Sequence, residues 1–201
     1  MSFRKTMNIR PATARDAAAL AHIQVNSYRT AYAGLMPADY LARFSLEEQE
    51  QDWRDLLAEP TGDILLVAEI DGGEIAGYAV GRPGPVQVLA LQAGKELPAG
   101  AYDAELVSLH VRRAAQRQGI GRALVRATAK ALHDQGCTSL ALFVLAGNPA
   151  CFFYERLGGQ RVGEKRWMIP ASEAGTWDDF DFEVVETAYA WPNIAVLSGG
   201  A

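Results

Sequence analysis

The segment from Glu105 to Leu145 constrains the fold most strongly, because it predicts three consecutive elements. Residues 105–111 fit a strand, a polar loop follows, residues 119–135 have the apolar spacing of an amphipathic helix, and residues 139–145 fit a second strand. A strand, a helix and a strand in this order predict two parallel strands joined by a right-handed crossover. The chain is therefore expected to fold as a mixed α/β domain.

Strand and helix signals also lie on both sides of this segment. Thr13 with Asp16, and Ser45 with Glu48, have the spacing of helix capping boxes. The glycines after Asp71 supply the positive φ that a tight hairpin turn needs. The further elements expected are a strand at 7–10, a helix at 14–30, two helices between 37 and 60, a hairpin of 64–70 with 75–80, a short helix at 148–157, and strands at about 161–169 and 180–190.

Length and composition bound the domain and its partners. The 201 residues are 49% hydrophobic, and no linker or internal repeat divides them. We expect one domain over residues 7–191, with terminal extensions at 1–6 and 192–201, and a Pro- and Gly-rich excursion between 82 and 101. The net charge of -5 argues against a broad basic surface for nucleic acid.

Neither the cysteines nor the N-terminus indicates secretion. Cys137 and Cys151 are the only cysteines and belong to no Cys/His cluster, so neither a disulfide scaffold nor a metal site is expected. The start has no apolar leader, and no stretch approaches the roughly 20 apolar residues that span a bilayer. We expect a cytoplasmic, unprocessed protein with no membrane partner.

The loop at residues 116–124 carries the most specific chemistry. Gly119 and Gly121 allow the backbone to approach a bulky ligand closely. The free amides of the loop point outward at the start of a helix, whose dipole adds partial positive charge, and Arg117 and Arg122 add full charges. This combination predicts a site for a pyrophosphate group.

A Gly-x-Gly pair alone is weak, because it also makes an ordinary tight connection. A dinucleotide-binding turn of the Rossmann type needs a small residue where Leu124 stands, and a P-loop needs a Gly-Lys-Ser/Thr sequence that this loop lacks. Neither of these two nucleotide-binding motifs is therefore expected.

The loop resembles the signature of the GNAT superfamily of N-acetyltransferases, an Arg or Gln followed by two spaced glycines, which Gln116, Gly119 and Gly121 match. Two further segments resemble the same family. Residues 104–111 are similar to its fourth strand, and residues 148–155 to its fourth helix.

The resemblance is dense over residues 104–159 and implies a fold. The expected architecture is a twisted, mostly antiparallel sheet of six to seven strands flanked by helices. Its fourth and fifth strands are parallel and splay apart to admit acetyl-coenzyme A, and no metal is implied.

The resemblance also implies cofactor contacts. The glycine loop is expected to bind the coenzyme A pyrophosphate, and the fourth strand to pair through its backbone with the pantetheine arm, where one amide polarises the thioester carbonyl. Asn148 equally suits a helix cap. The residues assigned to the cofactor are Leu109, His110, Val111, Gln116, Arg117, Gln118, Gly119, Ile120, Gly121, Arg122, Asn148, Phe153 and Tyr154.

Two catalytic roles are implied by the resemblance. Glu105 stands where some family members place a general base, and His110 or a bound water is the alternative. Tyr154 corresponds to a family tyrosine that protonates the departing thiolate, although a helical tyrosine also suits a core. A nucleophilic cysteine is not expected, since neither cysteine has a neighbouring histidine in the sequence.

The expected activity is transfer of an acetyl group from acetyl-coenzyme A to a primary amine by direct attack. The alternative is a non-catalytic domain that senses acyl-coenzyme A. The acceptor stays open between a small-molecule amine, an aminoglycoside, a protein amino terminus and a lysine side chain. Tyr28, Tyr32, Tyr40 and Trp53 do not decide it, since they suit either an acceptor pocket or a core. The alternating strand Phe182–Trp191 fits a sheet edge that pairs in a homodimer, or a half-buried strand in a monomer.

Overall fold

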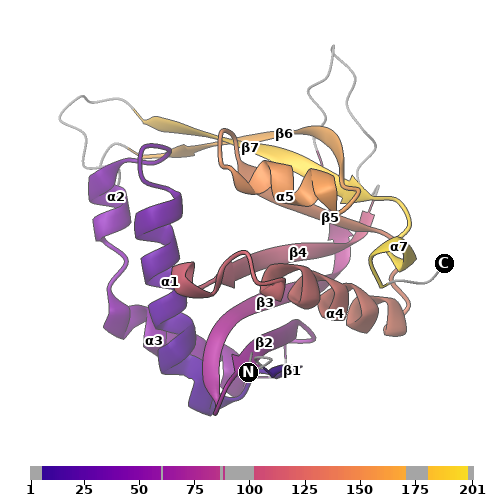
Figure 1. Ribbon diagram of the computed structural model, residues 1–201. Coiled ribbons are helices and arrows are strands. Elements are labelled where there is room, and N and C mark those ends of the chain that lie inside the picture. Colours follow the sequence, from indigo (N-terminus) through magenta and orange to yellow (C-terminus); the bar gives the residue numbers. More distant parts are fainter. Residues whose placement is uncertain (1–5, 60, 87, 89–101, 171–180, 199–201) are drawn as a thin grey trace.

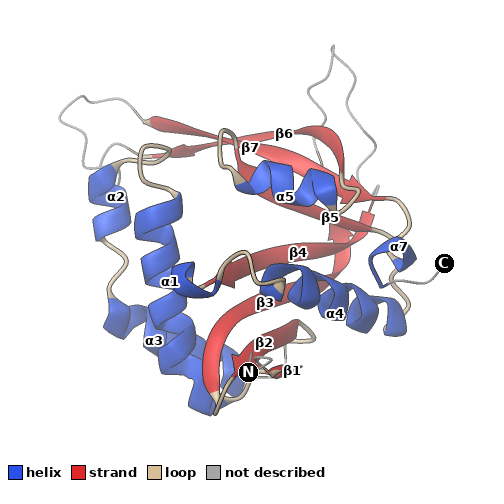
Figure 2. Ribbon diagram, in the orientation of Figure 1, coloured by secondary structure: helices blue, strands red, loops and turns tan. Residues whose placement is uncertain are grey.

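The computed structural model describes residues 6–59, 61–86, 88, 102–170 and 181–198. Seven strands form one mixed sheet in the order β1-β2-β3-β4-β5-β7-β6 (Figures 1 and 2). Every neighbouring pair is antiparallel except β4 and β5, which are parallel. The strands are β1 (Met7–Pro11), β2 (Ile64–Ile70), β3 (Glu74–Val86), β4 (Tyr102–Val111), β5 (Leu140–Leu145), β6 (Gln160–Ile169) and β7 (Phe182–Trp191).

Helices cover both faces of this sheet. One face packs on α4, α5 and α7, and the other on α1 and α3, with α2 beside α1 (Figure 1). None of the described helices is long and apolar enough to cross a membrane. The helices are η1 (Ala14–Asp16), α1 (Ala17–Ala31), α2 (Ala38–Ala42), α3 (Leu46–Ala58), η2 (Arg113–Ala115), α4 (Ile120–Asp134), α5 (Ala150–Arg156) and α7 (Ala195–Ser198).

The predicted helix starts and the hairpin turn are confirmed. The carboxylate of Asp16 accepts hydrogen bonds from the backbone and the hydroxyl of Thr13 at 2.8 and 3.0 Å. At α3, the Ser45 hydroxyl accepts from the amide of Glu48 at 3.1 Å. Between β2 and β3, Gly72 and the next glycine have φ of 85° and 102°. Local capping and turn chemistry therefore fixes these boundaries.

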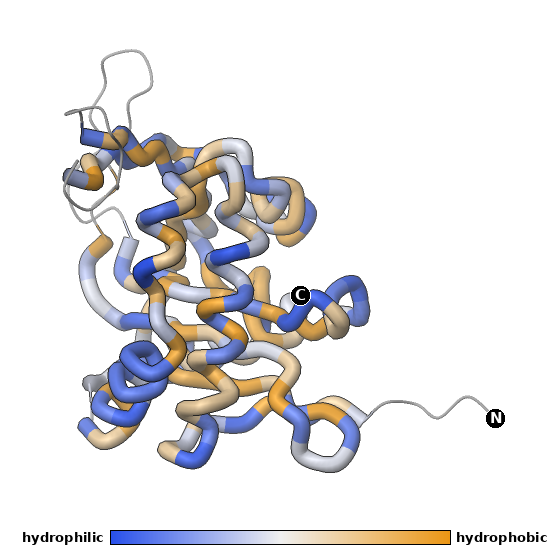
Figure 3. Tube along the Cα trace, turned by 90° about the vertical axis from the view of Figure 1, so that its left-hand side faces the viewer, coloured by the Kyte–Doolittle hydropathy of each residue, from blue (hydrophilic) through white to orange (hydrophobic). Residues whose placement is uncertain are grey.

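Two hydrophobic clusters hold the layers together. Apolar residues of α4, among them Leu124, Val125 and Leu132, are buried against one face of the sheet. On the other face, Leu20 and Trp53 from α1 and α3 pack against strand residues. Along α1 and α3, which face the viewer in Figure 3, hydrophobic residues recur between hydrophilic ones, as amphipathic helices on a sheet require.

Three sequence expectations need adjustment. β4 starts at Tyr102, three residues before the expected start. The strand Phe182–Trp191 is not at a sheet edge, because β7 pairs with both β5 and β6. The prediction of an exposed edge strand that pairs in a homodimer is therefore wrong. The expected excursion begins with Arg82–Val86, which extends β3, whereas residues 87 and 89–101 lie outside the described residues.

Beyond Trp191 the chain continues to contribute to the core. Ile194 and Leu197 are buried in the cluster that α4 covers. Residues 1–5 and 199–201 of the expected terminal extensions lie outside the described residues.

The carboxylate of Asp103 joins the starts of β4 and β5. It accepts hydrogen bonds from the amide and hydroxyl of Thr138 at 2.9 and 2.8 Å, and from the amide and hydroxyl of Ser139 at 2.8 Å each. After this point the parallel ladder contains one pair, Glu105 with Ala141. The two strands are thus fixed together at one end and unpaired beyond it.

We predict that Asp103→Asn lowers the free energy of unfolding by about 1–3 kcal/mol at pH 7, because the amide turns a donor toward donors. Burial raises the pKa of Asp103, but the hydrogen bonds from Thr138 and Ser139 outweigh it and lower the pKa overall. This contribution is therefore present above the unfolded pKa of about 4 and is lost as the pH falls through the lower folded pKa.

Denaturant unfolding at several pH values measures this contribution. The matched control is Asp134→Asn, which removes a carboxylate that is 57% exposed at the end of α4. Equal stability losses in the two variants, or a loss that does not shrink under acid conditions, would contradict the role of Asp103.

Candidate active site

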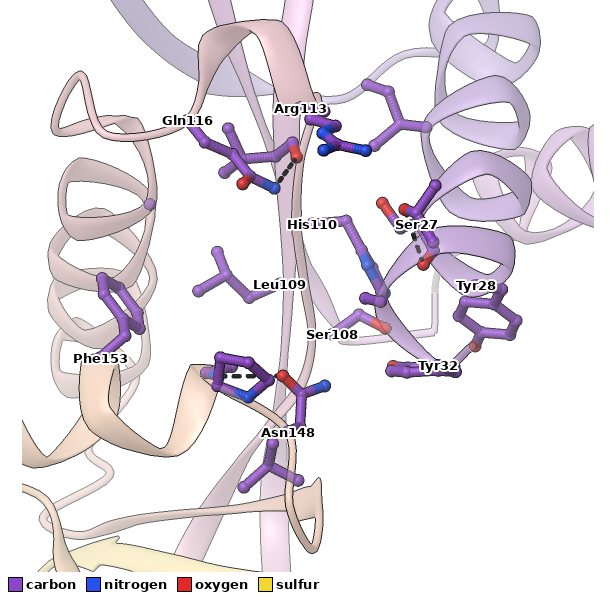
Figure 4. A pocket seen from close by; sticks show the side chains of 18 of the residues that line it. Ser27, Tyr28, Tyr32, Ser108, Leu109, His110, Arg113, Gln116, Asn148 and Phe153 are labelled. Carbon is purple, nitrogen blue, oxygen red and sulfur yellow. Dashed lines mark hydrogen bonds between the residues drawn. The ribbon is translucent and has the colours of Figure 1, made fainter. Parts of the chain in front are cut away.

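A cleft of about 1950 Å³ lies where β4 and β5 separate. One wall comes from α1 and α2, and the other from the loop before α4 and from α5. Figure 4 shows β4 between these walls, with Leu109 toward Phe153 on one side and His110 toward Tyr28 and Tyr32 on the other. The cleft therefore has two chemically distinct sides that meet along β4.

A bulge in β4 sets which side chains face each wall. Val80 pairs with Ser108, whereas the next residue of β3 pairs with Leu106, so Val107 is an additional residue in β4. The extra residue shifts the alternation, and both Leu106 and Leu109 pack on the α4 side. Ser108 and His110 consequently face the α1 side (Figure 4).

The loop before α4 is fixed by its own side chains. The side-chain amide of Gln116 donates to the carbonyl oxygen of Val111 at 3.1 Å. The side-chain amide of Gln118 donates to the carbonyl oxygen of Ala114 at 3.2 Å. Arg117 has a φ of 61°, and Gly119, the N-cap of α4, has a φ of 85°. These left-handed residues turn the chain sharply into the helix.

The loop suits a diphosphate group electrostatically. The first amides of α4 have no partner within the helix, and its dipole is positive at this end. Arg112, Arg113, Arg117 and Arg122 stand within or just before this loop in the sequence, and all four line the cleft. Among them, Arg112 also pairs with Glu74.

Gly121 provides room rather than an unusual backbone angle. A Cβ placed there would lie 3.4 Å from the ring of Phe153 and 3.8 Å from Val111. The absence of a side chain thus leaves space between α4 and α5, beside the strand expected to bind the pantetheine arm.

Asn148 forms a local hydrogen bond at the start of α5, where Pro149 is the N-cap. Its side-chain oxygen accepts a hydrogen bond from the amide of Ala150 at 2.9 Å (Figure 4). Asn148 also lines the cleft together with Phe153. The hydrogen bond from Ala150 and a ligand contact are compatible, because a side-chain amide has donors as well as an acceptor.

Tyr154 follows on α5 and is 8% exposed, with part of its surface lining the cleft. Its ring packs against those of Phe153 and Tyr189 at centroid distances of 5.2 and 6.2 Å. No described residue forms a hydrogen bond with its hydroxyl. Burial raises the pKa of Tyr154, so the phenol is protonated at neutral pH.

Glu105 lies beside the cleft without lining it, in contrast to its neighbour Leu106. In the sheet it stands opposite Arg82 on β3 and Ala141 on β5. Burial raises the pKa of Glu105, and the positive charges of Arg82 and Lys165 partly oppose that rise. The structure does not bring this carboxylate together with the cofactor-side residues.

His110 lines the cleft between two tyrosines. Its ring centroid lies 5.7 Å from that of Tyr28 and 5.3 Å from that of Tyr78. Burial lowers the pKa of His110 to about 4, so its imidazole is neutral at pH 7. This aromatic stack makes it a packed side chain of the α1 wall.

Of the aromatic candidates in the N-terminal half, Tyr28, Tyr32 and Tyr40 line the cleft. Trp53 does not, since it is buried against Tyr78 and donates to Gln24 at 2.6 Å. Sequence reasoning missed Trp167 and Glu186, which line the cleft from β6 and β7. The alternation of β7 marks Glu186 as outward-facing but does not reveal what lies opposite.

Comparison with known proteins places the chain in a family. The model of the Acetyltransferase (GNAT) family matches residues 27–159. This chain therefore belongs to the GNAT acetyltransferase family, and the class of enzyme is an acetyl-CoA-dependent N-acetyltransferase. A relative from Bacillus subtilis strain 168, named uncharacterized N-acetyltransferase YuaI, is 29% identical over 191 residues, covering 95% of this chain and 96% of the relative.

Solved structures share the fold. PaiA N-acetyltransferase from Thermoplasma acidophilum, crystallised with coenzyme A, has a TM-score of 0.63 at 17% identity, over 92% of this chain and 99% of that one. The structure of YncA from Salmonella typhimurium, with its cofactor acetyl-CoA, has a TM-score of 0.59 at 20% identity, over 92% and 93%. The expected mixed sheet with a parallel β4–β5 pair is thereby confirmed.

We predict that Gly121→Val weakens acetyl-coenzyme A binding at least about tenfold, because its methyl groups enter the space beside Phe153. Gly121→Ala adds only the Cβ and should weaken binding less. Isothermal titration calorimetry measures both affinities, and denaturant unfolding confirms that each variant is folded. Unchanged affinity in the folded valine variant would remove this loop from the binding site.

Proposed function

We propose that this enzyme transfers the acetyl group of acetyl-coenzyme A directly to a primary amine, with both substrates bound at once. The observation that carries this proposal is the two-sided cleft along β4. Its α4 side has arginines and free helix amides suited to a diphosphate, and its α1 side has aromatic residues and a carboxylate suited to an amine.

The residues present fit coenzyme A. The loop 116–122 would hold its diphosphate through amides and arginines. The backbone of residues 109–111 borders the gap between β4 and β5 and would pair with the pantetheine arm as an added strand would. Asn148 and Phe153 would contact that arm from α5.

Bound acetyl-coenzyme A supplies a thioester, whose carbon–sulfur bond breaks as the carbon–nitrogen bond to the amine forms. Glu105 accepts the proton that the ammonium group loses, through a water, since its side chain stands outside the cleft lining. Its raised pKa strengthens it as a base. Tyr154 donates its phenolic proton to the leaving sulfur.

Direct attack is favoured over an acyl-enzyme route. Neither Cys137 nor Cys151 lines the cleft, so neither thiol is placed to accept an acetyl group from this site. The amine itself is then the attacking group.

An acceptor screen tests the proposed activity. Purified protein and acetyl-coenzyme A are incubated with sets of small amines, peptides with free amino termini and lysine peptides. Free thiol release and product mass are both measured. We expect thiol release coupled to a mass increase in an amine that equals one acetyl group replacing one hydrogen. Tight acetyl-coenzyme A binding without transfer to any amine would instead support a sensor.

We predict that Glu105→Gln lowers the turnover rate by about 10² to 10⁴-fold, with little effect on acetyl-coenzyme A affinity. The remaining activity should also lose the acid limb that a deprotonated Glu105 imposes on the rate–pH profile. Because burial raises this pKa, that limb lies above the ordinary glutamate value of 4.5. Full activity of the variant across the pH range would exclude Glu105 and leave His110 or bound water as the base.

We predict that Tyr154→Phe slows single-turnover acetyl transfer by about 10² to 10⁴-fold and nearly preserves acetyl-coenzyme A affinity, because only the proton donor is removed. Tyr189→Phe is the matched control. In the wild type, the Tyr189 hydroxyl donates to Glu155 at 2.8 Å, and Tyr189 does not line the cleft. Single-turnover rates report the chemical step even where product release is slow. Equal rates in the Tyr154 variant and the wild type would contradict the acid role.

A further inference from the structure

One wall of the cleft consists of aromatic rings, in contrast to the arginine-containing loop before α4. Tyr28 lies 4.9 Å from Tyr32 and 4.8 Å from Phe44 between ring centroids, and Tyr40 lies 5.5 Å from Phe44. All four rings line the cleft, and Trp167 lines it from β6. Such rings pack well against apolar groups and attract cations to their faces.

Glu186 is the one acidic residue among the described residues that line the cleft. Its side chain is 20% exposed, so it is largely removed from bulk water. One carboxylate oxygen, Oε2, accepts from the Trp167 indole at 3.2 Å and lies 3.9 Å from the ammonium group of Lys165. The other oxygen, Oε1, accepts no hydrogen bond from a described residue, which leaves it available to a ligand.

Glu186 belongs to the aromatic wall through Trp167. The Trp167 indole that donates to Glu186 packs in the same hydrophobic cluster as Tyr32 and Tyr40. Glu186 and Tyr154 both line the cleft. A positive group held by Glu186 would thus stand in the same cleft as the proposed proton donor.

We propose that Glu186 binds the ammonium group of the acceptor through Oε1, and that the aromatic wall holds an apolar or aromatic body attached to it. This inference rests on the proposed function and narrows its substrate class to primary amines with such a body. A carboxylate next to the amine is disfavoured, because it would place two negative charges together in a poorly solvated site.

Equilibrium binding of three probes tests this class without relying on turnover. 2-Phenylethylamine has both the charge and the ring, ethylamine lacks the ring, and 2-phenylethanol lacks the charge. Calorimetry is performed with and without coenzyme A. We expect 2-phenylethylamine to bind at least about tenfold more tightly than either other probe. Phenylalanine, which adds a carboxylate, should bind more weakly than 2-phenylethylamine.

The variant Glu186→Gln removes the charge and keeps an oxygen that can accept from Trp167. The variant should bind 2-phenylethylamine at least about tenfold more weakly than the wild type does. Its affinities for 2-phenylethanol and coenzyme A should be nearly unchanged. The matched control is Glu183→Gln on the same strand, whose carboxylate is 48% exposed, pairs with Arg166 and does not line the cleft. This control should bind all probes as the wild type does.

The outcomes separate this inference from the proposed function. If coenzyme A binds and an amine is acetylated, but Glu186→Gln leaves 2-phenylethylamine affinity unchanged, the inference fails and the function stands. If the wild type binds the alcohol as tightly as the amine, or binds none of the probes, the inference also fails. If coenzyme A does not bind, the proposed function fails, and the probe comparison without coenzyme A still decides the role of Glu186.

Discussion

The four hydrogen bonds that Asp103 accepts from Thr138 and Ser139 fix the starts of β4 and β5 beside each other. One residue pair then continues the parallel ladder before the strands separate. A complete ladder between β4 and β5 would close the gap in the sheet. Without the hydrogen bonds of Asp103, the two halves of the sheet could move independently. The cleft depends on this combination, because the part of β4 that lies between the two walls of the cleft is left unpaired by β5.

The bulge at Val107 gives this part of β4 its two chemical faces. It directs Leu109 toward α4 and α5, and His110 toward α1 (Figure 4). Positive charge then gathers at the loop before α4, while Glu186 stands on the aromatic side. Under the proposed function, an anionic cofactor and a cationic acceptor would be attracted to different ends of one cleft, which would bring them together without placing like charges in contact.

The sequence was most informative where local chemistry decides structure. Capping by Asp16 and Ser45, the glycine turn before β3 and the amphipathic period of α4 all act over a few residues, and each was predicted. Contacts between residues far apart in the sequence were not predicted. The interaction of Asp103 with residues 35 and 36 positions later, the interior place of β7, and the place of Glu186 in the cleft arise only when distant segments meet. The relation of Glu105 to the cleft depended on such long-range pairing as well.

Hydrogen–deuterium exchange with and without coenzyme A tests most directly whether the gap between β4 and β5 is the cofactor site. We expect slower amide exchange at residues 109–111 and 117–122 when coenzyme A is bound, because these amides gain hydrogen-bond partners or lose access to water. The amides of β1 and β2 serve as an internal reference and should change little. Coenzyme A binding, verified by calorimetry in the same sample, with unchanged exchange at both segments would contradict the assignment.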